Sequence, residues 1–114
     1  MIPRVMDVEK FVIQGLLFDF YGELLTDRQK EVYSSVILED YSLSEVAEEL
    51  GISRQGVHDM IRRCSSILEG YEQKLHLVEK FLNIRNDVQR IHELAVSIHS
   101  GEIIELSDHI LSEL

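Results

Sequence analysis

The feature that most constrains the fold is the run SLSEVAEELGISRQGVHDMIRR at residues 42–63. Two helices that cross steeply over a three-residue turn need a small residue where they meet and a turn residue that tolerates positive φ. Ala47 and Gly51 meet these needs, and Ser53 can cap the second helix. The five positions that would face a shared core are all apolar: Val46, Leu50, Ile52, Val57 and Met60. The run therefore predicts a helix-turn-helix unit rather than an ordinary helical hairpin.

An apolar helix is predicted ahead of this unit, over residues 7–21. Asp7 can cap it and Gly22 can end it. Apolar residues occupy most of its circumference, which is typical of a helix buried on several sides. We therefore expect a second subunit or the C-terminal helix to cover part of it.

Two capping boxes mark the helices that follow. Thr26 with Gln29 predicts a helix that begins at Asp27 and ends near residues 39–41. Ser42 with Glu45 predicts the start of the first helix of the helix-turn-helix unit.

The helix that begins at Arg54 is predicted to be long. Its apolar residues follow the 4-3 spacing of a heptad seam, typical of a coiled coil or a long packed helix: Val57, Ile61, Cys64, Leu68, Tyr71, Leu75, Val78 and Leu82. Gly70 is inside the seam, and glycine weakens a helix interior. The helix could therefore continue through Gly70, kink there or end there. Together with the apolar first helix, the seam predicts a two-fold homodimer.

The C-terminal region is predicted to be a helical extension. The seam loses register after residue 82, so we expect a bend or turn near residues 83–86 and a helix to about Ser97. Ser100 and Gly101 are expected to form a loop, and Ser107 to cap a short helix through Leu111.

Composition supports an all-α chain. Hydrophobic residues make up 45% of the 114 residues, with one proline and six glycines, so a packed core is expected and a loop-rich fold is not. The length predicts a single domain over 1–114, with the helix-turn-helix core at 7–69 and the helical extension at 70–114.

The formal net charge is −10, and the acidic residues flank the motif. Residues 23–49 carry −6 and residues 93–114 carry −5, whereas residues 50–92 carry +2. A surface that coats DNA without sequence preference is normally much more basic. The acidic stretch at 39–49 is either a solvated helix face, a surface that repels non-specific DNA, or a docking surface for a basic partner.

If the unit binds DNA, the side chains at the start of its second helix reach the base edges. Arg54 suits guanine O6 and N7, and Gln55 suits adenine, whereas Asp59 places a negative charge on the exposed face. The candidate nucleic-acid-binding residues are Ser53, Arg54, Gln55, His58, Arg62 and Arg63, the last two as phosphate contacts. The alternative is a solvated helix face with ordinary charges.

Segments of the chain resemble two families. LTDRQKEV, SLSEVAEELGISR and the V…RR…L tail are similar to region 4 of the sigma-70 family, which reads the −35 promoter element. LFDFYGELLTDRQ and LEDYSLSEVAEELGISRQGVHD resemble the YlxM-like family more closely, from about residue 16 to 79. These are small bacterial helix-turn-helix proteins usually encoded beside genes of the signal recognition particle.

The resemblance implies a regulator, or an accessory of the signal recognition particle pathway with that particle's protein or RNA as partner. It implies no catalytic residues. The chain differs from a sigma factor in its acidity and in lacking upstream polymerase-binding regions.

Other chemistry is discounted. The five histidines lack the i,i+4 or HExxH spacing of helical zinc sites, so no metal site is expected. The chain has neither a phosphate-binding glycine motif nor a nucleophile elbow, which predicts a protein without a cofactor that is not an enzyme. Cys64 lies on the seam and is expected to be a buried, inert thiol rather than a redox sensor.

Localisation follows from the same features. A single cysteine predicts a reducing cytoplasm. The start MIPRVMDVEKF has no signal-peptide pattern, and no stretch is apolar for long enough to span a membrane.

Two functions from different classes are consistent with these residues. The favoured one is a dimeric DNA-binding regulator whose second motif helix lies in the major groove. The other is a protein-interaction adaptor that uses the same fold without sequence-specific DNA binding.

Overall fold

The computed structural model describes the backbone of residues 5–114 and the side chains from Lys10 onward. Throughout these residues the chain is helical, with no strand, which confirms the all-α prediction. The elements in chain order are α1 (Val5–Tyr21), η1 (Gly22–Leu24), α2 (Asp27–Tyr33), η2 (Ser34–Leu38), α3 (Leu43–Leu50), α4 (Arg54–Leu75), α5 (Leu77–Ser97) and α6 (Gly101–Glu113). They form two compact units, one ending at His76 and the other spanning Leu77–Leu114.

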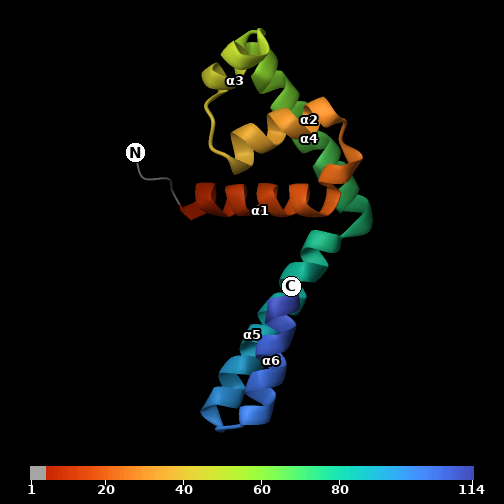
Figure 1. Cartoon of the computed structure of the whole chain (residues 1–114). Coiled ribbons are helices and arrows are strands. Elements are labelled where there is room, and N and C mark those ends of the chain that lie inside the picture. The colour runs from red at the N-terminus through yellow and green to blue at the C-terminus, as the bar shows by residue number, and fades with distance from the viewer. Residues whose placement is uncertain (1–4) are drawn as a thin grey trace. The chain divides into compact units, whose positions relative to one another are not determined.

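In the first unit α4 is the element against which the others pack. α3 lies at its N-terminal end, α2 packs along it, and α1 crosses near its C-terminal end (Figure 1). Leu17 of α1 and Cys64 and Leu68 of α4 are buried. Tyr21 donates a hydrogen bond of 2.6 Å to Glu72 there, so a polar contact also holds α1 on α4.

The N-terminal helix differs from its prediction at its start. It begins at Val5, two residues before Asp7, so Asp7 does not precede the helix as a cap; its side chain lies outside the described ones. Phe11 and Val12 are about half exposed within this chain, and the expectation that a second subunit covers part of α1 stays a prediction. The helix ends at Tyr21 as predicted, and Gly22 follows where a Cβ would lie 3.1 Å from the Phe18 ring.

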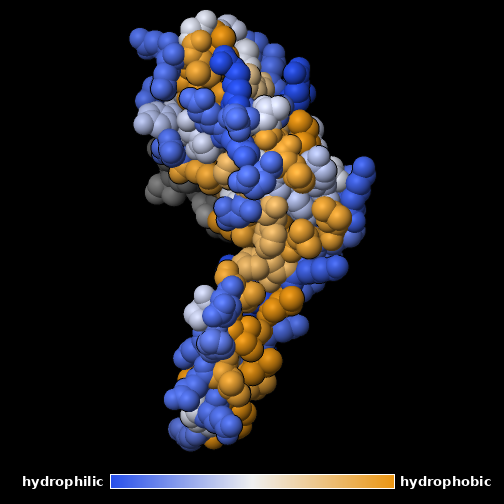
Figure 2. Space-filling view, turned by 45° about the vertical axis from the view of Figure 1, so that its right-hand side comes forward, coloured by the Kyte–Doolittle hydropathy of each residue, from blue (hydrophilic) through white to orange (hydrophobic). Residues whose placement is uncertain are grey.

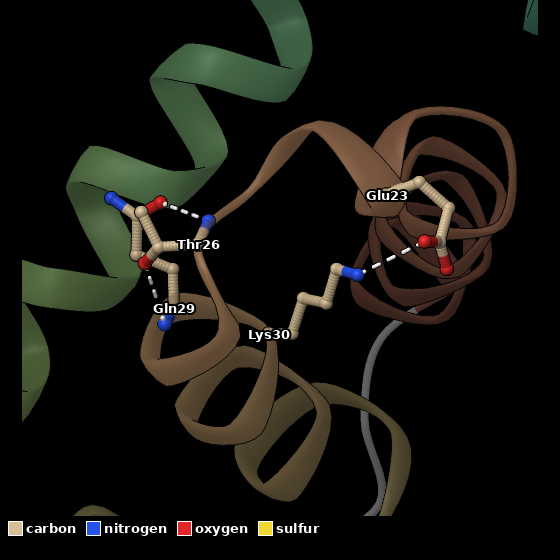
Figure 3. A network of polar contacts seen from close by, with 4 residues as sticks. All are labelled: Glu23, Thr26, Gln29 and Lys30. Carbon is tan, nitrogen blue, oxygen red and sulfur yellow. Dashed lines mark hydrogen bonds and ion pairs between the residues drawn. The ribbon is translucent and has the colours of Figure 1, made fainter.

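The capping box at the start of α2 is confirmed (Figure 3). The backbone N–H of Gln29 donates to the Thr26 hydroxyl, and the backbone N–H of Thr26 donates to the side-chain oxygen of Gln29. Lys30 forms a 3.0 Å ion pair with Glu23, which joins α2 to η1. Since the Glu23 side chain is 93% exposed, solvent screens this pair and its contribution to stability is small.

The second predicted helix ends at Leu38 after a widened π-helical turn, η2. The hydroxyls of Ser34 and Ser35 both donate to the Glu31 carbonyl. They compete with the backbone N–H groups for this carbonyl, which favours the wider π-helical hydrogen-bond pattern. Nearby, Tyr33 is fully buried, and burial raises the pKa of its hydroxyl, with a smaller opposing effect from the Ser65 hydroxyl.

The predicted long helix is shorter than expected. α4 continues through Gly70, which settles the alternative left open there, but it ends at Leu75 instead of residue 82. His76 follows with φ 56°, a left-handed conformation that no helix interior can accept. The heptad spacing gave no sign of this break because it continues across it.

The second unit is a hairpin of α5 and α6, which lie side by side (Figure 1). The prediction of a bend near residues 83–86 was wrong, since α5 runs without interruption from Leu77 to Ser97. The predicted Ser100–Gly101 loop and Ser107 cap were also wrong, because Ser100 caps α6 and Gly101 is its first residue. Ser107 is instead buried mid-helix, where its hydroxyl donates to the Ile104 carbonyl.

Candidate nucleic-acid interface

The helix-turn-helix unit consists of α3, a tight turn and the start of α4. Gly51 ends α3 in the left-handed conformation, with φ 68° and ψ 31°, as its position predicted. The Ile52 N–H then donates to the Ala47 carbonyl at 3.1 Å, which closes the turn. Ser53 caps α4 by accepting a hydrogen bond of 3.0 Å from the Gly56 N–H. These local contacts fix where the first turn of α4 begins.

A small apolar core holds the two helices together. Val46 and Ala47 of α3 and Val57 of α4 are buried against Val32 of α2. The remaining predicted core residues pack around this cluster and are partly buried: Leu50, Ile52 and Met60. The five positions predicted from the sequence therefore all face the shared core.

All six candidate binding residues are exposed, on α4 or at its cap: Ser53, Arg54, Gln55, His58, Arg62 and Arg63. Arg54, His58 and Arg62 are spaced by four residues, so they share one face of the helix. The Ser53 hydroxyl accepts the capping bond, and its O–H donor remains available for a further contact.

Two open grooves run along this surface of the unit. The first is lined by Leu43, Arg54, Gln55 and His58, and the second by Asp59, Arg62, Arg63 and Ser66. Sequence reasoning did not single out Leu43 or Ser66. Ser66 could have been found from its i,i+4 spacing to Arg62, whereas Leu43 enters only through the crossing of α3 over α4.

Asp59 engages its neighbours on the exposed face. The Gln55 Nε2 donates to Asp59 Oδ1 at 2.9 Å, and His58 Nδ1 lies 3.8 Å from the same oxygen. Within the described part of the chain, by contrast, no acidic side chain pairs with Arg54, Arg62 or Arg63. The side-chain nitrogen of Gln55 is therefore held by Asp59, and its side-chain oxygen remains available as an acceptor. The guanidinium donors of the arginines remain available for other contacts.

Replacing Asp59 is expected to strengthen binding to any duplex. Asp59→Asn removes one negative charge from the exposed face of α4 but keeps an acceptor for Gln55, so we expect roughly 3- to 10-fold tighter binding to random duplexes. Asp59→Ala should give the same gain in affinity. It should also free the Gln55 side chain from its hydrogen bond, so that the protein accepts more than one base at the position that Gln55 contacts. Fluorescence anisotropy with a random and a selected duplex measures both effects. Equal binding by all three proteins would contradict this role for Asp59.

Cys64 of α4 is fully buried, as predicted. Burial raises the pKa of its thiol, and the opposing effect of Arg63 is smaller. The described residues contain no group of three or more His, Cys, Asp or Glu side chains placed to hold a metal ion. Among the same residues, no helix is both long and apolar enough to cross a membrane.

The native thiol should resist alkylation. Since the thiolate is the reactive form, iodoacetamide is expected to modify Cys64 in denaturant but not in the folded protein, as measured by mass spectrometry. A folded pKa above the unfolded one also means that Cys64 contributes stability below pH 9.0, the ordinary thiol value, which is lost as the pH rises through the folded pKa. Cys64→Ala should remove that part of the pH dependence, and rapid alkylation of the folded chain would show that the thiol is accessible.

The fold and this surface define a helix-turn-helix protein. The sequence profile of the UPF0122 family, helix-turn-helix proteins like YlxM and p13, matches residues 8–107. The chain belongs to this family, as the YlxM resemblance indicated.

Relatives in the same family cover nearly the whole chain. YlxM of Bacillus subtilis strain 168 is 46% identical over 109 residues, covering 96% of this chain and 99% of that protein. UPF0122 proteins of Thermoanaerobacter sp. strain X514 and Acetivibrio thermocellus are 41% and 40% identical, and each alignment covers at least 93% of both chains.

Proposed function

We propose that this protein is a DNA-binding regulator of the cytoplasm that places the start of α4 in the major groove. One observation carries the proposal: α4 presents exposed arginines without acidic partners in the described chain, at the helix start fixed by Ser53 and Gly51. Arg54 and Gln55 contact base edges, and His58 adds specificity beside them. Arg62 and Arg63 contact the phosphates.

The charge distribution supports specific rather than general binding. The exposed carboxylates of Glu45, Glu48 and Glu49 on α3 lie in the same unit as the arginines. These carboxylates repel the DNA phosphates in most orientations of the protein on the duplex. Only a duplex that also offers favourable base contacts is therefore bound stably. A homodimer would bring two such helices to two half-sites, about 34–36 Å apart on the duplex.

The same carboxylates favour a second function, that of an adaptor. An exposed acidic α3 can dock a basic protein surface by charge complementarity without any DNA contact. Through the family resemblance, the partner proposed for this mode is the protein or the RNA of the signal recognition particle. An RNA partner is less favoured because RNA carries the same phosphate charge as DNA.

Two measurements on the wild-type protein distinguish these functions. Selection from a random duplex library at about 150 mM salt should enrich one sequence if the regulator proposal is correct. Recovery of the tagged protein from cells, with and without nuclease, then identifies its partners. No enriched sequence, together with partner proteins that survive nuclease treatment, would overturn the regulator and support the adaptor.

A further inference from the structure

The α5–α6 hairpin has an exposed apolar face. Its members are Ile84, Ile91 and Leu94 on α5, Ile98 directly after α5, and Ile103, Leu106 and Ile110 on α6, each 37–68% exposed. Ile98 still donates its backbone N–H to the Leu94 carbonyl, so it continues the helical path. Within each set the residues are spaced by three, four or seven positions, so each set lies along one side of its helix. Figure 2 shows hydrophobic side chains gathered along one side of the hairpin and hydrophilic ones along the other.

Few apolar side chains of the hairpin are fully buried. Val78, Val88 and Ala95 of α5 are buried, whereas the buried residue of α6 is the polar Ser107. His92 and Asp108 form a 3.0 Å contact between the helices at the surface. An exposed apolar patch beside so few fully buried apolar side chains is typical of a protein–protein interface.

We propose that this face pairs with the same face of a second copy to form an antiparallel four-helix bundle. The charges of the two helices favour a second copy and define its orientation. α6 carries four acidic residues and no lysine or arginine, whereas the acidic residues of α5 are balanced by Lys80, Arg85 and Arg90. Pairing α6 with the partner's α6 would bring like charges together, so α5 lies against the partner's α6.

The size of the face is that of the centre of such an interface. At about 1.5 Å per residue the face is about 20 Å long from Ile84 to Ile98 and about 10 Å long from Ile103 to Ile110, so with a hairpin width of about 20 Å it covers roughly 300 Å² in projection. A standard interface buries roughly 800 Å² on each partner, so the polar side chains that flank the face supply the rest of the contact.

Other surfaces are less suitable for this contact. The first half of the heptad seam is unavailable, because Val57, Cys64 and Leu68 are buried within the first unit. The exposed apolar side chains of α1 are Phe11, Val12, Ile13 and Phe20 among the described residues, and they are spread over about 200° of the helix circumference, so they do not form one narrow stripe. The bundle thus gives the homodimer of the proposed function a defined interface, and it does not depend on DNA binding.

The test is the oligomeric state of the full chain without DNA, measured by light scattering or sedimentation between about 1 and 100 μM. The wild type should have twice its 13.2 kDa chain mass. The double variant Ile91→Ala with Leu106→Ala should raise the dimer Kd at least ~10-fold, since truncated central interface residues weaken association. Alanine is the best helix former, so far-UV circular dichroism should be unchanged. Ile91→Glu should weaken the dimer further.

Gln89→Ala and Gln89→Glu are the matched controls. Gln89 is exposed and two residues from Ile91, hence on the opposite side of α5, and both changes should leave the dimer intact. A wild type that is monomeric throughout would overturn both the bundle and the homodimer. A dimer that the Ile91 and Leu106 changes do not weaken would overturn the bundle alone. Neither result depends on whether the protein binds a duplex.

Discussion

Arg54→Ala is expected to weaken binding to a selected duplex by about 5- to 150-fold, the loss of one bidentate arginine–guanine contact. Arg54 is the first residue of α4, where a helix in the major groove comes closest to the bases. In the described part of the chain Arg54 forms no ion pair with an acidic side chain, so DNA binding would not have to break one. The loss should fall on the selected sequence and leave random duplexes nearly unchanged. Fluorescence anisotropy at about 150 mM salt measures both.

Arg63→Ala is the comparison for this experiment. Because Arg63 is proposed to contact phosphate, its removal should weaken binding to all sequences alike and reduce the salt slope by about one. Arg54→Lys should keep the positive charge but lose the preference for the selected sequence, because lysine lacks the planar guanidinium group that forms two hydrogen bonds to guanine. If neither Arg54→Ala nor Arg63→Ala changes binding to any selected duplex, the DNA proposal is wrong.

Val57→Asp is expected to destabilise the first unit by about 3–5 kcal/mol, the effect of a buried charge without a partner. Val57 is fully buried at the contact of α2, α3 and α4. A carboxylate there must either lose its hydration or accept a proton, and the core cluster also loses an apolar member. Since domains are stable by only about 5–15 kcal/mol, much of the helix-turn-helix unit should unfold. Urea denaturation followed by far-UV circular dichroism measures the change.

His58→Asp introduces the same side chain one position later, on the exposed face of α4. Because solvent hydrates it there, its stability should stay within about 0.5 kcal/mol of the wild type. Similar urea midpoints for the two variants would mean that Val57 does not lie in a packed core.

The helix-turn-helix unit was predictable because its determinants are local. The Ser42–Glu45 capping box and the left-handed Gly51 involve residues at most a few positions apart. The Gln55–Asp59 contact has the same local origin, and its i,i+4 spacing could have revealed it. The exposure of the candidate residues also followed from helical periodicity, once Val57 had been assigned to the core.

The C-terminal half was less predictable. The heptad spacing joined Leu68 to Val78 in one seam, yet Leu68 is buried in the first unit and Val78 belongs to the second. Ser107 resembled a cap because serine is common there, but Ser100 caps the longer helix and Ser107 packs against its neighbours. Periodicity identifies apolar positions without identifying the surface that covers them.

The sequence by itself determined that the chain is helical, where its capping boxes and the motif turn lie, and which side of the motif's second helix is apolar. These properties depend on backbone preferences and hydrogen bonds between residues close in the chain. Only the tertiary structure decided that His76 separates two units and that α1 and the α5–α6 hairpin keep apolar side chains exposed. Those outcomes depend on which distant side chains fill each core, a packing problem that local spacing does not encode.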